Sequence, residues 1–152
     1  MDQSPAAVEQ HTASRTIHAL RGAAAGAERA IARALEPFGI TGAQFAVLDV
    51  MRQAAQQSMG CSELGRRLAG SSPDVTRLLD RLESGGLVSR ERDGNDRRVV
   101  YTRISEKGLE LMAAAAPKVR EAEEQLLADL HSGDRERLAE LLDQLQPRQP
   151  GN

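Results

Sequence analysis

The residues from Ser71 to Arg103 read SSPDVTRLLDRLESGGLVSRERDGNDRRVVYTR and carry more structural information than any other stretch of the chain. Ser72 precedes a proline, which suits an N-cap followed by a first helical position that needs no amide proton. Apolar residues then recur at intervals of three and four, which predicts a helix with one buried stripe. Gly85 and Gly86 supply a left-handed helix end. The buried stripe of this helix consists of Val75, Leu78, Leu79 and Leu82.

Beyond this helix the sequence predicts a short strand, a polar tip rich in Asp, Gly and Arg, and a second strand. A helix whose outer face carries arginines suits the major groove of duplex DNA, and a hairpin tip with arginines suits the minor groove. Taken singly, each feature is more often a solvated helix face or a solvated turn. The outer face of the helix carries Thr76, Arg77, Asp80 and Arg81.

The order of the elements gives the pattern its specificity. Upstream, the segment from Cys61 to Ala69 has its own helical pattern, with Leu64 and Leu68 facing inward and Ser62 as a cap. A short turn then leads into the second helix, as a helix-turn-helix requires. The sequence therefore predicts a mainly α fold with a small two- or three-stranded β wing, a winged helix-turn-helix.

Several motifs carry a resemblance to a known family. The chain resembles the MarR family of bacterial transcription regulators over roughly residues 38 to 112. The motifs are ITGAQFAVL (40–48), EL (63–64), VTRLLDRLE (75–83), GLVSR (86–90), DRR (96–98) and ISEKG (104–108). The resemblance implies one domain, 1–152, in which residues 38–104 form the DNA-binding lobe. It implies that residues 8–36 and 105–146 form a helical dimerisation lobe.

The resemblance also implies which residues contact DNA. In the wing, Arg98 enters the minor groove and Asp96 orients it, while Arg97 alternates to the other face of the strand. Asp74 departs from the small or hydroxyl-bearing residue usual in the family, so it either reads a cytosine amino group or caps the helix start. The expected major-groove contacts are Ser71, Ser72, Asp74, Thr76 and Arg77, and Arg81 is a further expected DNA contact.

Length, composition and charge agree with this interpretation. The 152 residues suit one domain, and an apolar set dominated by Ala, Leu and Val, with no Trp, one Tyr and two Phe, favours helices. The segment from Glu63 to Arg103 contains nine arginines and seven acids, a net charge of +2. Because the whole chain has a net charge of −2, the remaining residues carry −4. A basic lobe on an acidic body favours site-specific DNA binding over indiscriminate coating.

Other function classes find no support in the sequence. The chain has no phosphate-binding loop, no metalloprotease motif and no nucleophile–base pair, so we expect neither an enzyme nor a cofactor. The spacing of the three histidines predicts no metal site. A single cysteine, a polar N-terminus and the absence of a long apolar run predict a cytoplasmic protein that does not contact the membrane.

Three amphipathic segments flank the lobe. The first runs from Ser14 to Leu35, the second starts after a Ser105 cap, and the third is capped by Asp134 and extends to Leu145. We expect these helices to lie too far from the core of the lobe to be buried by it alone. A twofold dimer that interdigitates them is the simplest solution, with a closed monomeric bundle as the alternative.

A row of cationic residues suggests regulation. His11, Arg15, His18 and Arg21 follow one another at helical spacing beside the apolar face of the first helix. We expect this row to line a crevice for a small anion, an aromatic carboxylate or a phenol, such as related regulators bind. Gln44 and Phe45 would form the walls of the crevice. The alternative is a solvated face that pairs with acids of the partner chain.

The sequence therefore predicts a homodimeric repressor that a small anionic ligand releases from a palindromic operator. One alternative is a redox regulator that acts through Cys61. Redox-sensing members of the family carry their cysteine near the start of the first helix, so a packed, inert Cys61 is favoured. The other alternative is a helical interaction protein that does not bind DNA.

Overall fold

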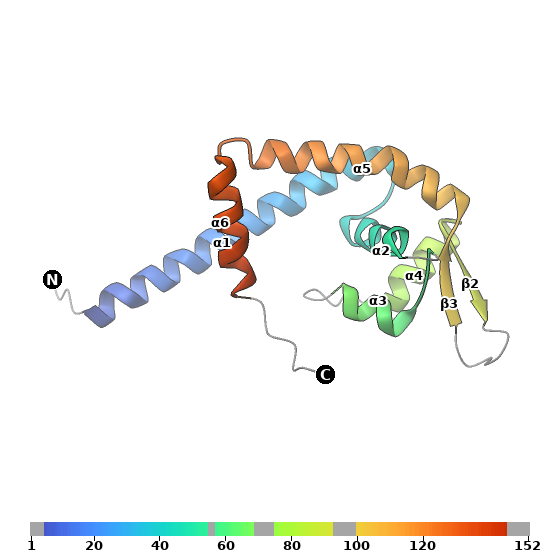
Figure 1. Ribbon diagram of the computed structural model, residues 1–152, viewed down its shortest axis with the longest axis horizontal. Helices are drawn as coiled ribbons and strands as arrows, with labels where there is room; N and C mark the ends of the chain where they lie inside the picture. Colours follow the sequence, from blue (N-terminus) through green and yellow to red (C-terminus); the bar gives the residue numbers. More distant parts are fainter. Residues whose placement is uncertain (1–4, 55–56, 69–74, 93–99, 146–152) are drawn as a thin grey trace.

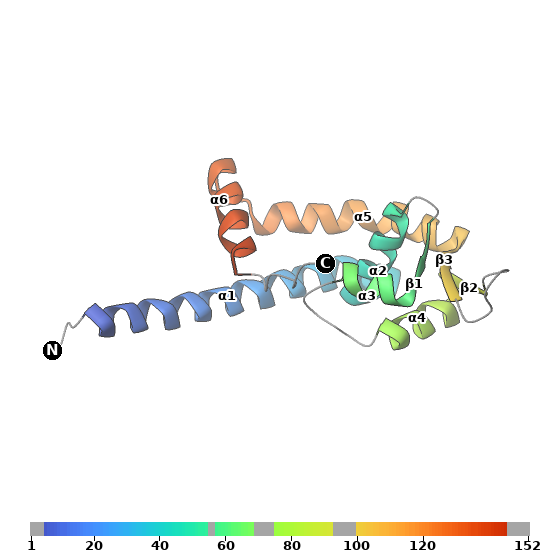
Figure 2. The same cartoon turned by 60° about the horizontal axis from the view of Figure 1, so that its bottom comes forward.

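The computed structural model of the chain describes residues 5–54, 57–68, 75–92 and 100–145. The protein is mainly helical with a small antiparallel sheet, as the sequence predicts (Figures 1 and 2). Its elements in chain order are α1 (Pro5–Leu35), η1 (Glu36–Phe38), α2 (Gly42–Gln53), β1 (Ser58–Gly60), α3 (Cys61–Arg67), α4 (Val75–Ser84), β2 (Val88–Arg92), β3 (Val100–Ile104), α5 (Glu106–Leu126) and α6 (Ser132–Asp143).

Helix α1 is longer than the sequence predicts. It begins at Pro5 and not near Ser14, and it runs for 31 residues to Leu35. Pro37 then lies in the 3-10 turn η1, which ends at Gly39 in the left-handed conformation with φ 67°. Both views show that the N-terminal half of α1 extends away from the helices and strands of the lobe (Figures 1 and 2). The body of this chain therefore leaves that half of α1 uncovered.

The sheet has three antiparallel strands in the order β1-β3-β2. The central strand β3 pairs Thr102 with Met59 of β1 on one side and with Arg90 of β2 on the other. Thr102 is only 2% exposed, and Met59 is equally buried. Since α3 begins directly after β1, the sheet connects the base of the wing to the first helix of the helix-turn-helix.

A single hydrophobic core joins the lobe to two of the flanking helices. Leu35 at the end of α1 and Met112 and Ala115 in α5 are fully buried together with Leu48 of α2 and Leu64 of α3. The expectation that the flanking helices lie beyond this core is therefore wrong for the end of α1 and the middle of α5. The reason is that α5 starts where β3 ends and packs across α2 and α1. Helix α6, in contrast, has no buried residue.

Two of the predicted helix caps are correct and two are wrong. Ser105 caps α5 by accepting the Gly108 N–H at 3.0 Å. Gly86, with φ 71°, ends α4 as predicted. Ser62 does not cap α3, because the helix already begins where β1 ends, after Gly60. Asp134 does not cap α6, because α6 begins two residues earlier, with His131 at the N-cap position and no side-chain cap bond.

Candidate nucleic-acid interface

Helix α4 has one buried face and one polar, exposed face. Leu78, Leu79 and Leu82 are at most 8% exposed and belong to the core. Thr76, Arg77, Asp80 and Arg81 are all exposed. The helix therefore presents the hydroxyl and guanidinium groups that the sequence assigns to DNA contacts, supported from behind by leucine packing.

The C-terminus of α4 is fixed by backbone hydrogen bonds. The Leu87 N–H donates to the Leu82 carbonyl at 2.9 Å, and the Gly86 N–H donates to the Glu83 carbonyl at 2.8 Å. This pair of bonds is a Schellman motif, which needs the left-handed backbone that glycine adopts at low cost. Since Leu87 is buried and β2 starts at the next residue, the motif sets the angle between α4 and the wing.

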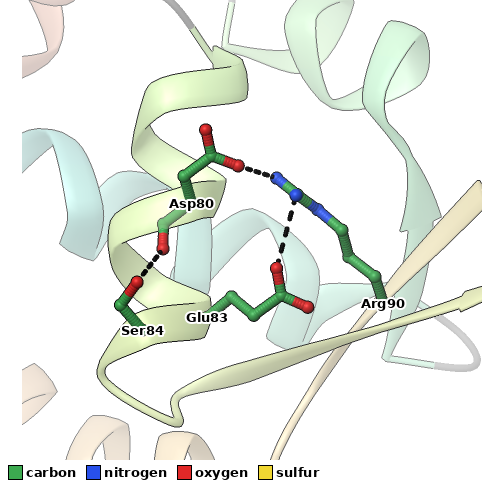
Figure 3. A network of polar contacts seen from close by, with 4 residues as sticks. All are labelled: Asp80, Glu83, Ser84 and Arg90. Carbon is green, nitrogen blue, oxygen red and sulfur yellow. Dashed lines mark hydrogen bonds and ion pairs between the residues drawn. The ribbon is translucent and has the colours of Figure 1, made fainter.

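An ion-pair network joins α4 to the wing strand β2 (Figure 3). The Arg90 Nη2 atom donates to the Asp80 carboxylate at 2.5 Å, and Arg90 Nη1 lies 3.3 Å from Glu83 Oε2. Ser84 Oγ donates to the backbone carbonyl of Asp80 at 2.9 Å. The sequence interpretation did not assign a role to Arg90. The available signal was an arginine in the first strand after a helix that ends with two acids on its outer face.

The start of α5 is attached to the same turn. Ser105 Oγ donates to the Gly86 carbonyl at 2.7 Å, and Lys107 Nζ donates to the Gly85 carbonyl at 2.8 Å. A Cβ added at Gly108 would lie 2.3 Å from the Leu87 carbonyl oxygen, so only glycine permits this approach. The start of α5 is therefore fixed by direct contacts to the turn that links α4 to the wing strand β2.

Six of the nine expected DNA contacts lie outside the described residues. The expected contacts that the structure describes are Thr76, Arg77 and Arg81, and all three are exposed on one helix. The remaining six stay predictions and are Ser71, Ser72, Asp74, Asp96, Arg97 and Arg98.

A single chain does not bring the expected ligand residues together. All four members of the cationic row are exposed on the part of α1 that extends from the body. Phe45 lies on α2 and lines a cavity of about 870 Å³. The Gln44 side chain accepts the Thr41 N–H at 2.9 Å in a capping box, so it serves the start of α2. The row consists of His11, Arg15, His18 and Arg21.

Cys61 is exposed, which corrects the expectation of a packed side chain. It is the first residue of α3, and the neighbouring core positions belong to Met59 and Leu64, which are 2% and 0% exposed. Within the described ranges, no three His, Cys, Asp or Glu residues are grouped as a metal site. Among the helices described, none combines the length and apolarity that crossing a bilayer demands.

The comparisons with known proteins agree with this geometry. Residues 40–100 match the model of the MarR family. The HTH-type transcriptional regulator YwoH of Bacillus subtilis is 37% identical over 110 residues, which cover 70% of this chain and 76% of that protein. A mutant of MarR from Escherichia coli, solved in complex with operator DNA, is 30% identical with a TM-score of 0.78 and covers 91% of this chain and 96% of that one.

A third protein is similar in fold alone. BpsR of Bordetella bronchiseptica, whose DNA binding is regulated by 6-hydroxynicotinic acid, is 22% identical with a TM-score of 0.76 and covers 84% of this chain and 90% of that one. Members of the MarR family are transcriptional regulators and not enzymes. With its exposed α4 face, its wing and these relatives, the chain belongs to the MarR family and is a DNA-binding transcriptional regulator of the winged helix-turn-helix fold.

Proposed function

We propose that this protein is a homodimeric repressor that binds an inverted-repeat operator in the bacterial cytoplasm. The observation that carries the proposal is the polar, arginine-bearing face of α4, which is held by leucine packing on one side and by Arg90 at its end. In such a dimer, two copies of α4 enter successive major grooves about 34 Å apart, one turn of DNA. Occupying the operator in this way keeps other proteins off it.

The dimer is supported by apolar surface that one chain leaves in water. Leu138 and Leu141 of α6 are 40% and 45% exposed, and Leu126 at the end of α5 is 48% exposed. Ile17, on the extended part of α1, is 53% exposed. A second copy that packs on these helices buries these side chains and brings two recognition helices onto one duplex.

Within this proposal, residues of α4 contact the major groove of DNA and residues of the wing contact the minor groove. Thr76 and Arg77 read bases in the major groove, together with residues from Ser71 to Asp74, and Arg81 contacts a phosphate. In the wing, Asp96 orients Arg98 toward the minor groove, and Arg97 contributes a weaker phosphate contact.

We also propose that a small aromatic acid or phenol releases the protein from its operator. Two observations support this: the cationic row on α1, and the regulation of BpsR, a protein of similar fold, by 6-hydroxynicotinic acid. The attachment of α5 to the α4–β2 turn offers a physical route, because a ligand that shifts α5 also shifts α4. A ligand that favours the released spacing by a few kcal/mol is enough to empty the operator.

The test is a binding titration on the DNA upstream of the protein's own gene. We expect protection of an inverted repeat in a footprint and an affinity that falls steeply with salt concentration. Titration with salicylate-like and nicotinate-like acids is expected to release the DNA, and Arg15→Ala and His18→Ala are expected to weaken that response. No salt-dependent binding to any fragment would contradict the regulator and favour an interaction protein that does not bind DNA.

A further inference from the structure

Helix α6 stands apart from the rest of the described chain. It has no buried residue, and none of the described elements packs along its length. Both views show α6 turning sharply away from the line of α5 (Figures 1 and 2). Since most helices in proteins are held by the packing of an apolar face, a helix that buries nothing needs another contact to set its direction.

Arg135, in the first turn of α6, makes such a contact. Its Nε atom donates to the Leu130 carbonyl at 3.1 Å, and its Nη1 atom donates to Glu124 Oε2 of α5 at 2.7 Å. These two bonds, here called the elbow, span the turn between the two helices. Within the described residues, no other side-chain hydrogen bond or ion pair connects α6 to another part of the chain.

The backbone of the turn does not join the two helices in this way. The Leu130 N–H donates to the Leu127 carbonyl at 3.0 Å, a bond that closes within the turn. The N–H groups of Asp134 and Arg135 both donate to the His131 carbonyl at 3.0 Å, and these bonds belong to the start of α6. None of the three reaches from α6 to α5. The elbow is therefore the contact that resists rotation of α6 about the dihedral angles of the turn.

An arginine suits this role for a geometric reason. Its guanidinium group is planar and presents several N–H groups in fixed directions. One nitrogen binds a backbone carbonyl and another binds a carboxylate, so a rotation of α6 breaks both bonds. The Arg135 side chain is 30% exposed and that of Glu124 is 74% exposed, so the ion pair adds little to the stability of the whole chain. Its effect falls on the direction of α6.

The helix whose direction is fixed carries exposed leucines. Leu138 is 40% exposed and Leu141 is 45% exposed. In the homodimer proposed above, a second copy covers these side chains. A helix that samples many directions presents them to that copy for only part of the time.

We propose that the elbow fixes the direction of α6 in the free chain, so that its leucines are in place when a second copy arrives. The proposal rests on the homodimer proposed above and makes Arg135 a positioning residue that acts without touching the partner. The apparent dissociation constant equals the intrinsic constant divided by the fraction of chains in the competent arrangement. Loss of the elbow lowers this fraction, so it slows association and leaves the dissociation rate of the formed dimer unchanged.

The test is Arg135→Ala in the full chain. Alanine has the highest helix propensity, so the substitution does not unwind α6, and circular dichroism verifies this. Cys61, the single cysteine, is exposed on α3 and carries a donor or an acceptor dye. Energy transfer between labelled chains measures Kd on dilution and the dissociation rate on exchange with unlabelled chain. We expect Kd to rise by about tenfold, about threefold for each of the two elbows, at an unchanged dissociation rate.

Three further variants locate the effect at the elbow. Glu124 acts through Arg135, so the double variant Glu124→Ala, Arg135→Ala is expected to dimerise like Arg135→Ala alone. Arg135→Lys keeps the positive charge but loses the planar pair of donors, and its Kd is expected to lie between those of the wild type and Arg135→Ala. The matched control is Arg137→Ala, which removes an ion pair of 2.9 Å with Glu140 inside the same helix and leaves the turn intact. Its Kd is expected to equal that of the wild type.

An Arg135→Ala variant with the Kd of the wild type would overturn the proposal. A dissociation rate that rises in proportion to Kd would also overturn it, because Arg135 would then be a contact of the interface. Equal weakening by Arg137→Ala would assign the effect to the charge of α6 and not to the elbow. Sedimentation of the unlabelled wild type tests the homodimer separately: a monomer there would overturn the homodimer itself, and the role of the elbow with it.

Discussion

Arg90 of β2 neutralises Asp80 of α4, with 2.5 Å between Nη2 and the carboxylate oxygen. Asp80 is exposed on α4, the helix that we propose enters the major groove. A carboxylate in that position would repel the phosphate backbone, and Glu83, one turn further on, would add to the repulsion. Arg90 binds both acids and joins α4 to the wing strand β2, so in the proposed complex it would reduce this repulsion.

We predict that Arg90→Met weakens operator binding by about tenfold, because two acids lose their countercharge near the phosphates. The melting temperature should change little, because ion pairs whose side chains are 31% to 53% exposed contribute only about 0–1 kcal/mol to stability. Fluorescence anisotropy with operator DNA measures the first quantity, and thermal denaturation the second. Arg137→Met, which removes an exposed pair with Glu140 inside α6, is the control and should not affect DNA binding. Equal DNA affinity in both variants would exclude this role of Arg90.

We predict that Gly108→Ala destabilises the protein by about 1–3 kcal/mol, because the added Cβ would lie 2.3 Å from the Leu87 carbonyl oxygen and 2.8 Å from Ile104 Cγ1. Urea denaturation followed by circular dichroism measures the change. The matched control is Gly65→Ala in α3, where an added Cβ meets nothing within 4 Å. That change should stabilise the helix by about 0.5–1 kcal/mol. A Gly108→Ala variant as stable as the wild type would refute the close packing of α5 on Leu87.

We predict that Arg77→Ala costs about 1–3 kcal/mol of operator binding and relaxes specificity at one base pair, as loss of a base contact does. Arg81→Ala should instead weaken binding to all sequences by a similar factor and reduce its salt dependence, as loss of a phosphate contact does. Binding to a library of single-base operator variants separates the two outcomes. Uniform weakening by Arg77→Ala would make Arg77 a phosphate contact.

We predict that Arg98→Ala abolishes most operator binding with little change in melting temperature, because a minor-groove arginine acts on DNA and not on the core. Arg97→Ala should have a smaller effect, because alternate residues of a strand point to opposite faces. The two variants are compared in the same binding titration at fixed salt. A weaker effect of Arg98→Ala than of Arg97→Ala would reverse the assignment.

The elements of the lobe were predictable because their signals are local. The leucine spacing of α4, the glycine that ends it and the Ser105 cap each depend on residues within a few positions of one another. The expected caps Ser62 and Asp134 are absent because contacts beyond the local sequence decide where α3 and α6 begin. The start of α3 follows from the pairing of β1 with β3, and α6 begins early, where Arg135 bonds the Leu130 carbonyl and Glu124. Pairing and side-chain contacts across a turn override a local capping preference.

The helix-turn-helix, the arginine-bearing outer face of α4 and the family were therefore readable from the order of residues, because periodicity and turn chemistry act over short distances. The pairing of Arg90 with Asp80, the burial of Met112 in the lobe core and the gathering of Glu28, Asp49 and Glu123 around one cavity were not readable in that way. Each of these features joins side chains from different elements. Which side chains meet depends on how the elements pack: Met112 and the cavity depend on the packing of α5 against α1 and α2, and the Arg90–Asp80 pair depends on the angle between α4 and β2. Only the folded chain specifies these arrangements.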